Sequence, residues 1–88
     1  AVMAGNFSTI LWARLFETLP ARWGIPPSAA LPYLEQVTAN LSAGHGAALT
    51  GPLARGDAQT IAANLAGLDG DRFRGVYAAF VEAHENRR

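Results

Sequence analysis

The 88-residue sequence contains no cysteine and no lysine. Without cysteine the chain can form no disulfide and offers no thiolate ligand to a metal ion. All seven basic residues are arginine, and seven acidic residues balance them, so the formal net charge is zero. A chain without excess positive charge lacks the main driving force for sequence-independent binding of nucleic acid. Nucleic acid is therefore not an expected partner.

Long apolar runs are missing too. No segment approaches the roughly 20 consecutive apolar residues that a helix needs to span a bilayer. The first six residues also lack the cationic region of a signal peptide. We therefore expect a cytoplasmic protein without a membrane segment. Half of the residues are apolar, which argues against disorder and is enough for one small hydrophobic core.

Apolar residues recur at spacings of three and four along most of the chain, which predicts an all-α bundle of about four helices. No strand pattern and no internal repeat is present. The predicted helices cover residues 2–19, 28–43, 58–66 and a last segment from 69 or 71 to about 85. Pro20 is expected either to end the first helix near Leu19 or to kink it, so that it continues to Trp23 and stops at Gly24.

The first predicted helix is apolar over an unusually wide arc, roughly 200° or more at 100° per residue. Its apolar residues are Met3, Phe7, Ile10, Leu11, Trp12, Leu15, Phe16 and Leu19. A helix that packs on one small core needs about half of that arc. Part of the helix is therefore expected to be covered by a second chain or by another domain. The alternative is a central helix surrounded by its own three neighbours.

The opening residues point to a longer parent protein. Helical periodicity begins almost at Ala1, with no initiator methionine and no Ser, Thr or Asp cap ahead of it. We expect the chain to be one domain, residues 1–88, of a protein that continues on its N-terminal side.

Residues 44–57 form the one long segment without helical periodicity, and they hold four of the nine glycines. Asp57 at its end is expected to cap the following helix by accepting an N–H bond near Thr60. Arg55 has two interpretations of equal weight. It could bind a phosphate or carboxylate beside the helix N-terminus, or it could form an ion pair with Asp57 or another acid.

A complete reaction centre is not recognisable. His45 titrates near neutral pH but has no partner set for catalysis, so a solvated loop histidine is the favoured interpretation. His84 falls on the apolar stripe of the last helix. Two histidines and scattered carboxylates do not suggest a metal site. Asn40, at the edge of an apolar stripe, is expected to form an interhelical hydrogen bond, with a ligand contact as the alternative.

The segment Leu49–Asp57, followed by Ile61 and Leu65, resembles a signature of one bacterial family. It is similar to the C-terminal helical domain of an uncharacterised family of Rossmann-like NAD(P)-binding proteins. These are related to pyrroline-5-carboxylate reductase, 6-phosphogluconate dehydrogenase and the deazaflavin-dependent NADP reductases. The resemblance extends over nearly the whole chain through Asn6-Phe7, a Gly-Ile-Pro linker and Asn40-Leu41.

The resemblance implies a bundle like the C-terminal domain of 6-phosphogluconate dehydrogenase. In the parent, an N-terminal Rossmann domain would bind NAD(P), while this helical domain would form a homodimer through its first helix and close the cleft. By the same match, the residues expected to line that cleft are Asn6, Asn40, Thr50 and Arg55. The chain has no Gly-x-Gly-x-x-Gly motif and no parallel-sheet pattern. It is therefore expected to bind no cofactor and to catalyse nothing alone.

A second function also fits the sequence. The chain could be a free-standing helical module that binds a partner protein and has no enzymatic role. This alternative predicts an exposed groove that takes a partner helix and no cleft at residues 44–57.

Overall fold

A computed structural model describes residues 1–86, the side chain of Ala47 excepted. Helices account for the regular structure of these residues, and no strand occurs among them, so the predicted all-α class is confirmed. None of the helices within this range has the length and apolar character needed to cross a membrane. The contacts divide the chain into two compact units, one of residues 1–44 and one that begins at His45.

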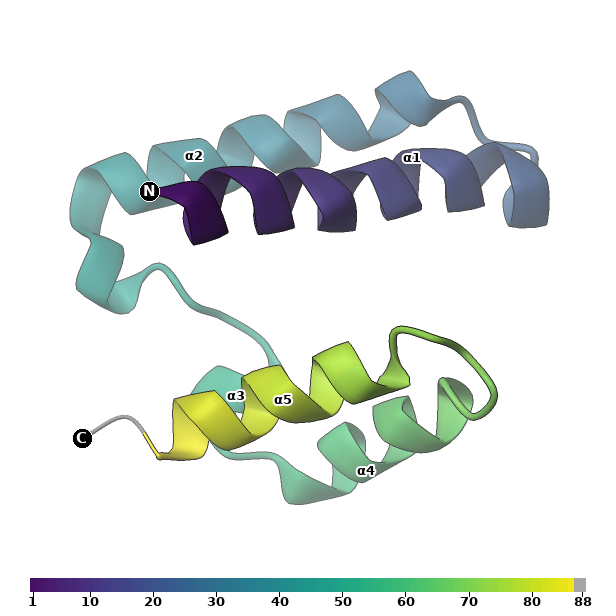
Figure 1. Cartoon of the computed structure of the whole chain (residues 1–88). Coiled ribbons are helices and arrows are strands. Elements are labelled where there is room, and N and C mark those ends of the chain that lie inside the picture. Colours follow the sequence, from purple (N-terminus) through teal and green to yellow (C-terminus); the bar gives the residue numbers. More distant parts are fainter. Residues whose placement is uncertain (87–88) are drawn as a thin grey trace. The chain divides into compact units, whose positions relative to one another are not determined.

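The first unit is a helical hairpin (Figure 1). A π-helical turn, η1 (Met3–Phe7), leads into α1 (Ser8–Trp23). A 3-10 turn, η2 (Pro27–Ala30), then opens α2 (Leu31–Gly44), which runs back antiparallel to α1. The joint between the arms holds the one buried side chain of this unit, Ala30, which is 6% exposed. The edge of the Tyr33 ring meets the Trp12 ring, with 5.6 Å between their centroids, so α2 contacts α1 through aromatic side chains.

The first helix continues through Pro20 to Trp23, which is the second of the two outcomes expected at that proline. Pro20 lies in the last turn, where the missing N–H leaves only one carbonyl without its usual helical partner. Gly24 ends the helix with a positive φ of 63°, and its amide donates to the Pro20 carbonyl at 3.2 Å. This is the left-handed stop that glycine permits at low cost.

The second unit is built on a pair of antiparallel helices, α4 (Ala58–Gly67) and α5 (Arg74–Glu85) (Figure 1). Two short elements precede them, a 3-10 turn η3 (His45–Ala47) and the single turn α3 (Pro52–Arg55). Ile61 of α4 is 8% exposed and is the buried centre of this unit. The Arg74 side chain donates from Nε to the Leu65 carbonyl at 3.2 Å and so ties the start of α5 to the end of α4.

In the second unit an added helical turn and a later helix start differ from the prediction. The segment expected to be irregular contains α3, whose four residues are too few to show a helical period. Pro52 at its first position presets the helical φ, and Gly56 ends it with a φ of 67°. The last helix begins at Arg74, later than expected, because Asp71 accepts the Phe73 amide at 2.8 Å and holds a turn there.

Candidate functional site

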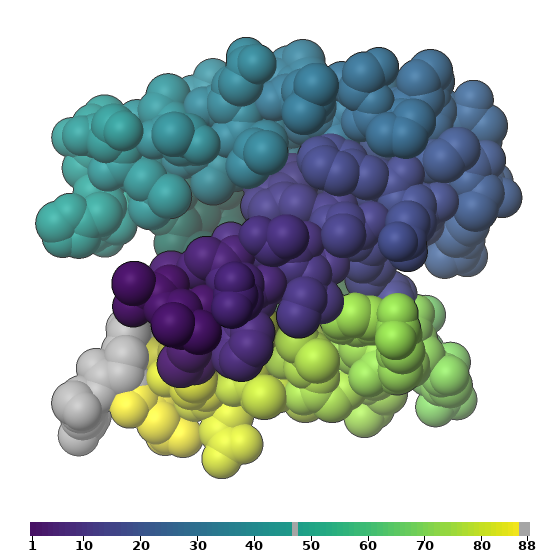
Figure 2. All heavy atoms as spheres, turned by 45° about the horizontal axis from the view of Figure 1, so that its top comes forward, coloured from purple at the N-terminus to yellow at the C-terminus, as the bar shows by residue number. Residues whose placement is uncertain are grey.

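One side of the first helical segment is an exposed apolar surface of the first unit. We call it the outer face and define it by Met3, Phe7, Ile10 and Leu11, which are 70%, 49%, 50% and 38% exposed. Figure 2 shows the side chains at the start of the chain, in purple, standing at the surface. Met3 and Phe7 are about one turn apart along η1, and Ile10 and Leu11 follow Phe7 by three and four residues, so the four positions form one patch.

The opposite side of the same helix packs within the hairpin. Trp12 and Phe16 are half-buried, and their ring centroids lie 6.3 Å apart. Trp12 also makes the ring contact with Tyr33. The helix therefore has two apolar sides, and the hairpin covers only the one that carries these rings. These two apolar sides together make up the wide apolar arc seen in the sequence.

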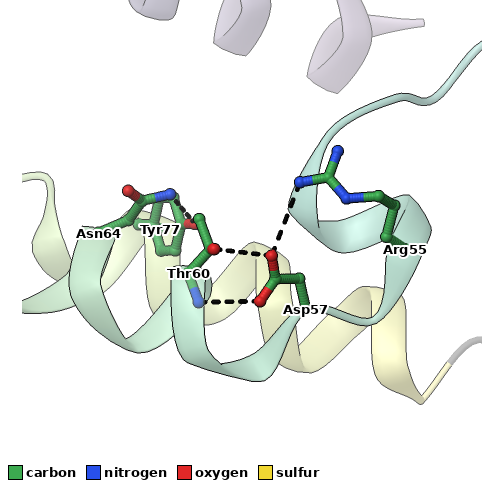
Figure 3. A network of polar contacts seen from close by, with 5 residues as sticks. All are labelled: Arg55, Asp57, Thr60, Asn64 and Tyr77. Carbon is green, nitrogen blue, oxygen red and sulfur yellow. Dashed lines mark hydrogen bonds and ion pairs between the residues drawn. The ribbon is translucent and has the colours of Figure 1, made fainter.

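A small polar network lies at the start of α4, within the second unit (Figure 3). The Asp57 carboxylate accepts the backbone amide of Thr60 at 3.1 Å and its hydroxyl at 2.7 Å. The predicted N-cap of α4 is thus confirmed, down to the residue whose amide is bound. The guanidinium of Arg55 lies 3.7 Å from the same carboxylate.

These contacts change the acidity of Asp57. The hydroxyl of Thr60, its amide and the positive charge of Arg55 favour the ionised carboxylate. The two contacts from Thr60 have the largest effects, desolvation comes next and acts against them, and Arg55 has a smaller effect; together they hold the pKa of Asp57 below its usual value of 3.8. Because the folded pKa is lowered, the stabilisation is present above pH 3.8 and is lost as the pH falls through the folded value.

Removing the cap tests this network. We expect Asp57→Ala to lower the melting temperature by about 5 °C at pH 7, since the Thr60 amide loses its partner. Asp57→Asn is the matched control, because asparagine caps helices as well as aspartate does. It should stay close to the unsubstituted chain at pH 7. The stability advantage of the natural chain over Asp57→Ala should shrink as the pH falls below 3.8. A difference that grows on acidification would contradict the assigned pKa direction.

Of the two roles expected of Arg55, the structure shows the ion pair with Asp57. Its side chain is 62% exposed and faces Asp57, whose carboxylate occupies the donors at the start of α4. An external phosphate would have to compete with that carboxylate for the same helix N-terminus. The guanidinium has further N–H groups that the contact with Asp57 does not use. The expected role of Arg55 in lining a cleft therefore stays a prediction.

The other cleft candidates lie at three separate places. Asn6 is exposed in η1, and Asn40 is half-buried in α2, where its carbonyl accepts a bond from Gln36 at 2.8 Å. This bond joins two residues of one helix, four apart, and is not the interhelical bond that was expected. Since α2 returns along α1, Asn6 and Asn40 lie toward the same end of the hairpin (Figure 1). Thr50 is exposed in the loop before α3, in the second unit with Arg55.

One polar contact was missed by the sequence analysis. The amide of Asn64 on α4 donates to the hydroxyl of Tyr77 on α5 at 3.1 Å (Figure 3). The sequence shows Tyr77 only as a member of the apolar stripe of the last helix. The polar Asn64 in the preceding predicted helix was the available signal for this contact. It does not identify Tyr77 as its partner until the pairing of α4 with α5 is known.

The histidines form no metal or catalytic group. His45 is exposed in η3, and His84 is half-buried in the last turn of α5. Within residues 1–86 no group of three or more His, Asp or Glu side chains could hold a metal ion. Neither histidine is therefore assigned a role in chemistry.

Comparison with family models gives one match, over residues 1–84. The chain belongs to the family described as Domain of unknown function (DUF2520). The match covers both units, so the hairpin and the α4–α5 pair both fall within the matched family domain. No curated protein and no solved structure matches the chain.

Proposed function

We propose that this DUF2520 chain is the dimerisation and cleft-closing domain of an NAD(P)-dependent oxidoreductase and is not catalytic alone. The observation that carries the proposal is the outer face. A helix that packs one apolar side within its own hairpin and exposes four large apolar residues on another has a surface suited to a further protein. We assign that surface to a second copy of the chain.

The cleft-closing part of the proposal comes from the resemblance of residues 49–57 and the flanking helices. NAD(P) would be held by a Rossmann domain of the parent protein, which would lie in the cytoplasm, and not by these residues. Of the four candidates, Thr50 and Arg55 are the more exposed pair that share one unit. An arginine with free N–H donors fits the phosphates or the carboxylates that such a cleft presents.

The role of Arg55 can be measured in the parent protein. We expect Arg55→Ala to weaken binding of NADPH or of the anionic substrate about tenfold, the loss typical of a charged hydrogen bond. Arg22→Ala is the control, because Arg22 is also an exposed arginine but lies over the ring of Trp23 in the other unit. Equal effects of the two substitutions would contradict a specific place for Arg55 at the cleft.

The presence of the implied domain is tested by the reading frame upstream of Ala1. A glycine-rich strand-turn-helix there is the expected result. An immediate start codon would favour the alternative, a free-standing helical interaction module. That alternative uses the same outer face, but a different protein would bind to it. Sedimentation of the chain by itself separates the two, since only the first requires self-association at micromolar concentration.

A further inference from the structure

We infer that two copies of the chain pair through their outer faces with the first helices antiparallel and the two-fold axis close to Phe7. The inference rests on the proposed dimerisation and adds its geometry. It uses the exposure of the apolar residues, the area they offer and the charges that follow them on the same side of the helix.

The area is sufficient for a dimer. With about 200 Å² for a fully exposed large side chain, the four residues of the outer face present roughly 400 Å² of apolar surface. Protein interfaces are only about 56–58% apolar, so such a patch corresponds to roughly 700 Å² per partner once its polar rim is included. Stable interfaces of standard size bury about 600–1,000 Å² per partner, and roughly 700 Å² falls in the lower part of this range. A second copy that contributes the same patch therefore meets the requirement.

The direction of the pairing follows from charge. Beyond Ile10, the same side of the helix continues with Arg14 and then Glu17. A parallel pair would place each of these residues opposite its own copy, and like charges at close range are unfavourable. An antiparallel pair overlaps the apolar part of one helix with the apolar part of the other and moves both charged positions away from their copies.

The position of the axis follows from the symmetry. In a two-fold interface, residue i meets residue j and j meets i. The exposed apolar residues lie on both sides of Phe7, with Met3 before it and Ile10 and Leu11 after it. An axis near Phe7 brings Phe7 against its own copy and Met3 against Leu11 of the second copy. Met3, Phe7 and Leu11 are then covered by large apolar side chains of the second copy, and Ile10 lies opposite its Ala4.

A rival surface exists on α5, where Val76 and Phe80 are 38% and 53% exposed. These two residues present less than half the apolar area of the outer face. We therefore assign the second copy to the outer face and use α5 as the control.

The absence of cysteine makes the test direct, because every introduced thiol is the only one in its chain. We expect Phe7→Cys to form a disulfide-linked dimer under mild oxidation, since paired Cβ atoms must come within about 4.5 Å. Phe80→Cys, from a phenylalanine of similar exposure, should stay unlinked. Mixing Met3→Cys with a mass-tagged Leu11→Cys should give mainly the mixed dimer. Circular dichroism confirms that each variant is folded.

The outcomes separate the geometry from the proposed function. Self-linked Met3→Cys and Leu11→Cys dimers without the mixed species would indicate parallel helices and overturn the inference while leaving dimerisation intact. Linkage through Phe80→Cys in preference to Phe7→Cys would move the interface to α5 and overturn it as well. A chain that sediments as a monomer at micromolar concentration would overturn the proposed dimerisation, and the geometry with it.

Discussion

Phe7→Glu should convert the proposed dimer to a monomer at micromolar concentration. Phe7 is 49% exposed in the middle of the outer face, so in the proposed dimer its ring would become fully buried. Central aromatic residues of an interface typically contribute 2 kcal/mol or more, and a carboxylate at that place would also be desolvated without a partner. The dissociation constant should therefore rise at least about 30-fold.

The matched control is Phe80→Glu. Phe80 is also a phenylalanine on a helix, is 53% exposed and lies on α5 of the other unit. Both substitutions add one negative charge to the same chain, so a general effect of charge or of lost hydrophobicity would appear in both. Sedimentation equilibrium of the two variants and the natural chain gives the dissociation constants. If Phe80→Glu dissociated the dimer and Phe7→Glu did not, the assignment of the outer face would be wrong.

The fold was predictable where its causes are local. The spacing of apolar residues gave the four longer helices, and Asp57 was recognised as a cap because its partner, Thr60, is three residues away. The exposure of the outer face agrees with the wide apolar arc of the sequence, which exceeds what one small core covers. The turn α3 was missed because four residues do not establish a period.

The candidate site was less predictable because its contacts depend on which helices pair. Asn64 and Tyr77 are thirteen residues apart, and their hydrogen bond exists only once α4 and α5 are antiparallel. Asn40 was expected to form a hydrogen bond with another helix. Its partner is instead Gln36, four residues earlier in α2, and this bond does not depend on how the helices pack. The choice for Arg55 could not be made from sequence, since the ion pair depends on how Gly56 turns the chain between Arg55 and Asp57.

Trp12→Ala should be the most damaging single substitution for the stability of the hairpin. The Trp12 ring contacts Phe16 along α1 and Tyr33 on α2, so it is one of the side chains that join the two arms. Replacing a fully buried large aromatic by alanine costs about 3–5 kcal/mol, and about 2–3 kcal/mol is expected here because Trp12 is only half-buried. A change of that size lowers the melting temperature by roughly 10–20 °C in a domain of this length.

The same helix provides the control for that experiment. Trp23 is 58% exposed, and its ring lies 5.4 Å from the guanidinium carbon of Arg22. An exposed cation–π contact contributes only about 0.5–1 kcal/mol, so Trp23→Ala should lower the melting temperature far less than Trp12→Ala. Helical circular dichroism followed through thermal and urea unfolding measures both variants, and Trp12 then remains as the sole tryptophan of the control chain. Its fluorescence should shift to longer wavelength on unfolding, since the ring leaves a half-buried site. Equal losses from the two substitutions would mean that the arms of the hairpin are held by something other than the Trp12 ring.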